Sequence, residues 1–105
     1  MPPDRLVMLE TLVSKAPNDP FPYYCLAQEL RGRGRFEDAV KAFEDLRGRF
    51  PAYVPQYLMA AQVLQELSRL DDARAVLTAG VSAARAARDS HSLGELEGLL
   101  ASLGA

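Results

Sequence analysis

Apolar residues recur along the chain with the spacing of an α-helix, in segments of roughly 12 to 15 residues that prolines and glycines separate. In the clearest stripes they occupy positions i, i+3, i+4 and i+7, which puts the side chains on one face of a helix. These stripes are Tyr23, Leu26, Ala27 and Leu30, and Tyr57, Ala60, Ala61 and Leu64. No segment alternates with period two for long enough to predict a strand. The pattern therefore predicts an all-α fold of about six helices.

The segments are related to one another by an offset of 34 residues, the sequence distance from Tyr23 to Tyr57. Further pairs at this offset are Ala27 with Ala61, Leu30 with Leu64, Ala39 with Ala73, and Phe43 with Leu77. The connection repeats as well, because RFEDA at 35–39 recurs as RLDDA at 69–73. An offset that holds across two helices and their connection indicates an internal repeat, in which stacked helix pairs complete each other's core.

The period and the residue types resemble the tetratricopeptide repeat, a helix pair with a bulky aromatic, small residues where its helices meet, and a closing proline. In the first repeat the matching positions are Tyr23, Leu26, Ala27, Leu30, Ala39, Phe43 and Pro51. In the second repeat they are Tyr57, Ala60, Ala61, Leu64, Ala73 and Leu77. Arg85 replaces the closing proline of the second repeat, so we expect that helix to continue to Arg88. The resemblance covers residues 20–84 and implies a short right-handed superhelix of antiparallel helices.

We expect one domain over residues 1–105, because a chain of this length holds a single core. Its predicted parts are a half-repeat helix at 4–15, a first repeat at 20–51, a second repeat at 54–88 and a capping helix at 92–103. Ser92 and Glu95 have the spacing of a capping box, which predicts that the last helix begins there. One face of this helix carries Leu93, Leu96, Leu100 and Leu103. The face is either the cap that closes a solenoid or a dimer contact.

The charge balance gives little support to nucleic-acid binding. The chain has 12 Lys and Arg against 14 Asp and Glu, a net charge of -2, whereas nucleic-acid binders that rely on bulk electrostatics are strongly basic. The densest basic run is Arg31, Arg33 and Arg35. These arginines either complement helix C-termini, which we favour, or form a patch for an acidic peptide or RNA.

No catalytic, cofactor-binding or metal site is predicted, and we expect no enzyme activity. Cys25 is the single cysteine, and the only histidine, His91, lies in a distant connection and has no second ligand at metal-binding spacing. Acidic pairs such as Glu37 with Asp38 lie in the first turn of a predicted helix, where the helix dipole favours negative charge. Only the abundance of carboxylates supports the alternative of an enzyme or enzyme subunit.

The start of the chain lacks the basic segment and apolar stretch of a signal peptide. No apolar run approaches the ~20 residues that a membrane span needs. We therefore expect a cytoplasmic protein without a membrane partner.

The family resemblance implies that the first helix of each pair lines a concave face. The side chains there that the core does not use are Phe21, Tyr24, Gln28 and Arg31 in the first repeat, and Pro55, Leu58, Gln62 and Gln65 in the second. Aromatic and apolar residues take positions where a merely solubilising face would carry Glu and Lys, which is typical of contact anchors. The alternative is that the terminal helices cover these residues.

Members of that family that grip the carboxylate end of chaperones carry Lys and Asn at positions held here by Tyr24, Gln28 and Met59. Their two-carboxylate clamp is therefore not expected. The residues predict a protein-interaction module that binds an apolar or mixed partner segment as a helix or an extended peptide. The alternative is a homo-oligomerising assembly protein that uses its terminal helix or an exposed apolar face.

Overall fold

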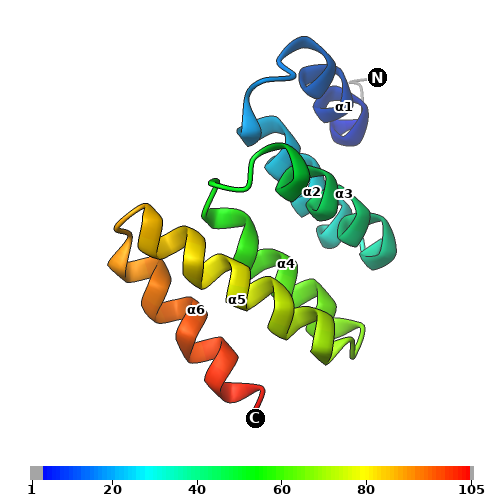
Figure 1. Ribbon diagram of the computed structural model, residues 1–105. Coiled ribbons are helices and arrows are strands. Elements are labelled where there is room, and N and C mark those ends of the chain that lie inside the picture. Colours follow the sequence, from blue (N-terminus) through cyan, green and yellow to red (C-terminus); the bar gives the residue numbers. More distant parts are fainter. Residues whose placement is uncertain (1–3, 105) are drawn as a thin grey trace. The chain divides into compact units, whose positions relative to one another are not determined.

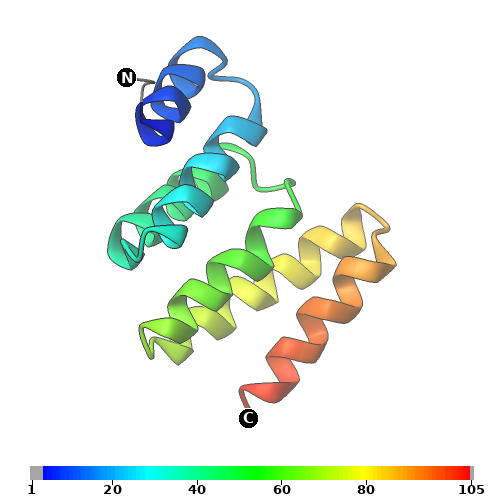
Figure 2. The same ribbon diagram turned by 180° about the vertical axis from the view of Figure 1, so that it is seen from behind.

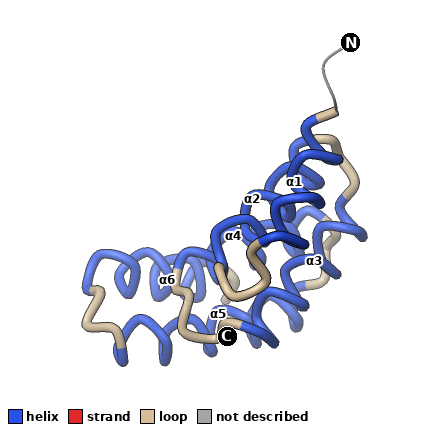
Figure 3. The backbone as a smooth tube through the Cα atoms, turned by 90° about the horizontal axis from the view of Figure 1, so that it is seen from above, coloured by secondary structure: helices blue, strands red, loops and turns tan. Residues whose placement is uncertain are grey.

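The computed structural model describes residues 4–104, which form six α-helices joined by turns and contain no strand (Figures 1 and 3). The helices are α1 (Arg5–Lys15), α2 (Pro20–Gly32), α3 (Phe36–Arg49), α4 (Pro55–Glu66), α5 (Leu70–Ala86) and α6 (Ser90–Ser102). They group into an N-terminal unit, α1 to α3, and a C-terminal unit, α4 to α6, which divide between Phe50 and Pro51. The predicted all-α fold is confirmed.

In the N-terminal unit, α2 packs against both α1 and α3 (Figure 2). Asp19 caps α2 with a carboxylate that accepts a hydrogen bond from the Phe21 amide at 3.0 Å, and Pro20 follows at a position where its missing N–H is not needed. The helix ends before Gly34, whose φ of 75° is the left-handed conformation that glycine adopts most easily. These local signals explain why α2 and α3 are separated by so short a turn.

Two alanines lie where α2 and α3 pack together. Ala27 and Ala39 are both fully buried, and Tyr23 and Phe43 are 5% and 1% exposed. Small side chains at the contact let two helix backbones approach closely, and the large side chains fill the space beside them. Leu26, which the apolar stripe also predicts to be in the core, is only partly buried.

In each repeat, a tyrosine hydroxyl forms a hydrogen bond with the loop that precedes the repeat. The Tyr23 hydroxyl donates a hydrogen bond to the Pro17 carbonyl at 3.1 Å, and the Tyr57 hydroxyl donates one to the Pro51 carbonyl at 2.5 Å. Both rings are buried, so the bond gives each phenol a partner while the ring fills the core. The internal repeat therefore extends to side-chain hydrogen bonding.

In the C-terminal unit, α5 packs against α4 and α6, and α4 also contacts α6. Gly80 makes the close approach of these helices possible. A Cβ at this position would lie 2.6 Å from the Cβ of Tyr57 and 3.1 Å from a methyl carbon of Leu96. Because Gly80 has no side chain, Tyr57 and Leu96 can both lie against the α5 backbone.

The boundaries of α5 and α6 differ from the sequence-based expectation. The 17-residue α5 is longer than the 14-residue α3, as the missing proline predicts, but it ends at Ala86 rather than Arg88. Arg88 has a φ of 55°, which ends the helical conformation.

Helix α6 begins at Ser90, so the predicted capping box at Ser92 is wrong. The capping residue is Asp89, whose carboxylate accepts hydrogen bonds from the Ser92 amide at 3.0 Å and the Ser92 hydroxyl at 2.7 Å. Aspartate is a strong N-capping residue, and because Asp89 lies three residues before Ser92, the helix begins before the predicted position. Glu95 instead lies 3.2 Å from the His91 ring nitrogen.

Candidate protein-binding surface

Four predicted contact residues share one stretch of α2. Phe21 is 58% exposed, whereas Tyr24, Gln28 and Arg31 are partly buried. The Gln28 amide nitrogen lies 3.4 Å from the Tyr24 hydroxyl, which it meets one helical turn away. Burial raises the pKa of the Tyr24 phenol, so this side chain stays neutral and able to donate a hydrogen bond at physiological pH.

The other four predicted contact residues lie on α4. Pro55 is exposed at its start, and Leu58, Gln62 and Gln65 are partly buried along it. They therefore retain accessible surface on a helix whose buried residues are Gln56, Tyr57, Ala60, Ala61, Val63 and Leu64. The α2 set and the α4 set belong to different units, and each is described on its own helix.

The basic run near the end of α2 is engaged in ion pairs. Arg33 contacts the carboxylate of Asp4 and lies 3.0 Å from Glu29, and the two acids raise the pKa of its guanidinium. Arg33 in turn lowers the pKa of Asp4, chiefly through its hydrogen bond. Arg35 lies 3.0 Å from Asp38 at the start of α3. Much of the positive charge of this run is therefore offset within the unit.

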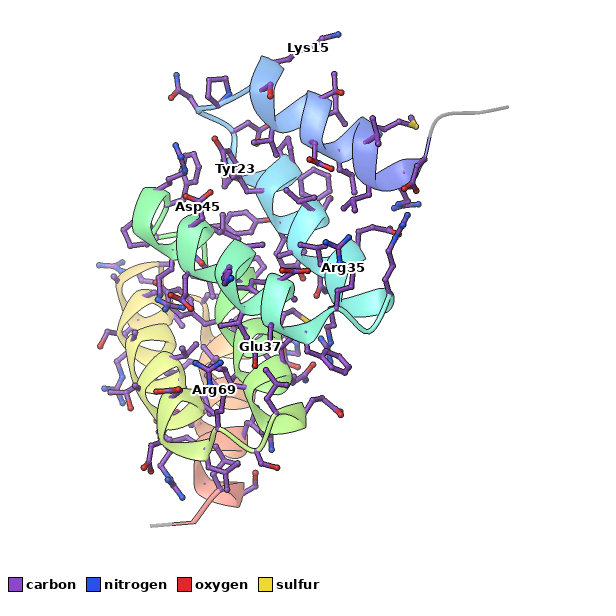
Figure 4. The ribbon with its side chains drawn as sticks, turned by 90° about the vertical axis from the view of Figure 1, so that its right-hand side faces the viewer. Lys15, Tyr23, Arg35, Glu37, Asp45 and Arg69 are labelled. Atoms are coloured by element: carbon purple, nitrogen blue, oxygen red, sulfur yellow. The ribbon has the colours of Figure 1, made fainter. Side chains whose placement is uncertain are left out.

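The carboxylates of the second repeat have similar structural roles. Asp72 pairs with Arg69 at 3.2 Å, and Asp71 pairs with Arg74 at 2.7 Å. The Arg35 and Arg69 side chains lie at the starts of equivalent helices (Figure 4). Residues 4–104 contain no cluster of three or more His, Cys, Asp or Glu side chains that is placed to hold a metal ion.

Two surface grooves in the C-terminal unit were not predicted. One, of about 560 Å³, lies between α5 and α6 and is lined by Thr78, Val81, Arg85, Glu97, Leu100, Ala101 and Gly104. We call it the α5–α6 groove. The other, of about 500 Å³, is lined by Pro51, Ala52, Tyr57 and five small residues of α5 and its end, Ala79, Ser82, Ala83, Ala86 and Ala87. The small residues along α5 are the sequence signal that could have indicated the second groove.

A third surface lies at the other end of the chain. Val7, Met8 and Leu12 of α1 are about half exposed, at 54%, 50% and 48%. Exposed apolar residues gathered on one helix are typical of interaction surfaces. Their apolar character is visible in the sequence, but their exposure depends on which helices pack against α1.

A family profile describing the tetratricopeptide repeat matches residues 30–94. That span covers more than half of the chain. The chain belongs to the tetratricopeptide repeat family. The resemblance seen in residues 20–84 is thereby confirmed. No curated protein sequence matches the chain.

Solved structures of other tetratricopeptide repeat proteins agree with this assignment. A tetratricopeptide repeat domain protein from Salinibacter ruber, solved in solution, is 32% identical with a TM-score of 0.79, over 84% of this chain and 89% of that one. Its crystal structure gives 32% identity and a TM-score of 0.76, over 81% and 94%. A Bordetella parapertussis protein shares the fold, with 19% identity and a TM-score of 0.80 over 97% and 89%.

The tetratricopeptide repeat generally mediates protein–protein interaction, and proteins of this family are generally scaffold modules without enzyme activity. Within the described residues, every helix is too short or too polar to cross a membrane.

Proposed function

We propose that this tetratricopeptide repeat protein is an adaptor that binds a segment of a partner protein through the exposed surfaces of α2 and α4. Phe21 carries the proposal, because this phenylalanine on the first helix of a repeat leaves 58% of its surface exposed instead of entering the core. Aromatic side chains in such positions are frequent anchors of protein contacts.

The side chains around Phe21 indicate the chemistry of the partner segment. Tyr24 offers a neutral hydroxyl and an apolar ring edge, and Arg31 offers a positive charge at the far end of the stripe. The Gln28 amide nitrogen donates to the Tyr24 hydroxyl and its Oε1 atom is buried, so Gln28 positions Tyr24. Leu58 adds an apolar contact on α4, beside Gln62. Each of these two surfaces, taken on its own helix, suits an apolar or mixed segment laid down as a helix or an extended peptide.

The test is capture of partners from native lysate with the wild type, Phe21→Ala and Tyr24→Ala, followed by direct binding of the identified segment. Leu70→Ala is the matched control, because Leu70 is also an exposed apolar residue, 40% exposed, but lies at the start of α5. We expect both α2 variants to lose segments that the control retains. Unchanged binding by both α2 variants would rule out this surface.

Self-association is a second candidate function, which the exposed side chains Val7, Met8 and Leu12 favour. Light scattering over a wide range of concentration tests it, and a molecule that stays monomeric throughout would exclude it.

We also propose that the protein acts in the cytoplasm, on the ground that its single cysteine, Cys25, cannot form an internal disulfide. Fractionation of cells that express a tagged protein tests the location.

A further inference from the structure

An ion-pair cluster joins the start of α1 to the end of α2, and its members are Asp4, Arg5, Glu29 and Arg33. Arg33 donates hydrogen bonds from both terminal nitrogens to the two carboxylate oxygens of Asp4, one of them at 3.2 Å. Arg5 lies 2.9 Å from Glu29, which also pairs with Arg33 at 3.0 Å. Bidentate geometry and shared members make this network stronger than isolated surface pairs.

Few apolar contacts hold α1 in place besides this cluster. Within the N-terminal unit, α1 packs against α2 but not against α3. Leu9 is the buried residue of α1, and Leu6 and Val13, on the same face, are partly buried. Helix α3, by contrast, buries Ala39, Val40, Phe43 and Leu46. Because burial of apolar surface is the main source of stability, the ion pairs make a larger relative contribution to the docking of α1.

The other end of α1 is attached by an uncharged interaction. Helix α1 ends at Lys15, and the loop that follows it offers the Pro17 carbonyl to the Tyr23 hydroxyl, which donates a hydrogen bond at 3.1 Å. Both partners are neutral and the Tyr23 ring is buried, so dissolved salt has little effect on this bond. Helix α1 therefore has a salt-insensitive attachment at its end and a charged attachment at its start.

The cluster is accessible to solvent, which makes it sensitive to ionic strength. The exposed fraction of the side chains ranges from 22% for Glu29 to 74% for Arg5. The Debye length falls from about 30 Å at 0.01 M salt to about 3 Å at 1 M, so exposed ion pairs weaken over this range. Asp4 also caps α1 by accepting a hydrogen bond from the Leu6 amide at 3.4 Å. One carboxylate therefore contributes both to the docking of α1 and to its first turn.

We propose that the ion-pair cluster is a salt-sensitive lock, and that rising ionic strength releases the start of α1 from α2 while α2 and α3 remain folded together. The loop at Pro17 acts as the hinge of this motion. Release exposes the apolar face of α1 around Leu9 and the side of α2 that this face covers. The inference concerns a conformational change within the N-terminal unit and does not depend on the partner proposed above.

Hydrogen exchange of the native full chain, measured by mass spectrometry, tests the release of α1. The concentration of sodium chloride is raised from about 0.01 M to 1 M, and peptides from α2 and α3 are the internal reference. We expect the α1 amides to exchange about threefold to tenfold faster at high salt, relative to the reference peptides. If exchange in α1 does not change relative to α2 and α3, the proposal is wrong.

Two substitutions test whether the cluster causes the response. Arg33→Gln removes both pairs of Arg33, and Glu29→Gln removes the pair with Arg5. At low salt, each variant should exchange its α1 amides about threefold faster than the wild type, and the double variant should lose most of its dependence on salt. Arg35→Gln is the matched control, because its ion pair with Asp38 lies within the start of α3. The control should match the wild type at every salt concentration, and circular dichroism checks that each variant folds.

Tyr23→Phe distinguishes the lock from the hinge. This substitution removes the hydrogen bond to the Pro17 carbonyl and keeps an aromatic ring in the core. Because the lost bond is uncharged, exchange in α1 should rise by a similar factor at low and high salt, which leaves the salt dependence of the wild type intact. A salt response that persists in the double variant, or one that disappears in Tyr23→Phe, would overturn the proposal.

Discussion

Replacing Gly80 with alanine tests whether its missing side chain is what lets α4, α5 and α6 pack together. The substitution adds one methyl group in the interior of α5, where alanine is otherwise the better helix former. Taken alone, the higher helix propensity of alanine would stabilise the protein by about 0.8–1.0 kcal/mol. The structure predicts the opposite sign.

The cost arises from contacts that cannot relax easily. The new Cβ would lie 2.6 Å from the Cβ and 2.9 Å from the Cγ of Tyr57, atoms that are fixed close to the α4 backbone. Carbon atoms prefer a separation of about 3.5–4.0 Å, so the helices must move apart. Overpacking of this kind costs about 1–3 kcal/mol, which outweighs the gain in propensity. After the gain in propensity is subtracted, we expect a net loss of up to about 2 kcal/mol.

Gly98→Ala provides the matched control. Gly98 also lies inside a helix of the same unit, but a Cβ there would meet no atom within 4 Å. Alanine should therefore stabilise the protein by up to about 1 kcal/mol. Urea titration followed by circular dichroism measures both changes. A Gly80→Ala variant as stable as Gly98→Ala would refute the packing argument.

Three further predictions follow from the buried contacts and the caps. Tyr57→Phe removes only the hydrogen bond to the Pro51 carbonyl and should cost about 0.5–1.5 kcal/mol in thermal unfolding, with no change in helix content. Ala39→Leu should cost about 1–3 kcal/mol because Ala39 is fully buried, and an unchanged melting temperature would contradict the close contact of α2 and α3. Hydrogen bonds from Ser92 lower the pKa of Asp89, so this cap stabilises the fold above about pH 3.9 and is lost as the pH falls through its lower folded-state pKa. Asp89→Asn should therefore weaken the acid sensitivity of α6 amide protection, measured by hydrogen exchange.

The fold could be predicted from the sequence because both repeats contain the same pattern of residue types. The same residue types recur at Tyr23 and Tyr57 and at Ala39 and Ala73, so helix type, pairing and turn position reinforce one another. The helix boundaries that the sequence did not predict depend on which of two nearby residues caps a helix, or on the conformation of one residue at its end. Asp89 caps α6 in place of Ser92, and Arg88 adopts a left-handed conformation that a residue pattern does not reveal.

The candidate surfaces could be predicted only in part. Helical geometry alone indicates that Phe21 and Tyr24 lie off the core stripe, and the structure shows that Phe21 is exposed. The α5–α6 groove could not be predicted, because it depends on how far α6 inclines from α5 and on the small size of Ala101. The exposure of Met8 depends likewise on which helices pack beside α1.

The composition of α6 has a consequence for how the C-terminal unit opens. Only Leu96 of this helix is buried. The interior of the helix contains Gly94 and Gly98, and each glycine destabilises the helical conformation by about 1 kcal/mol relative to alanine. The Arg74 guanidinium holds its far end by donating to the Leu103 carbonyl at 3.1 Å. Helix α6 should therefore fray first, exchanging its amide protons and admitting proteases while α4 and α5 remain folded.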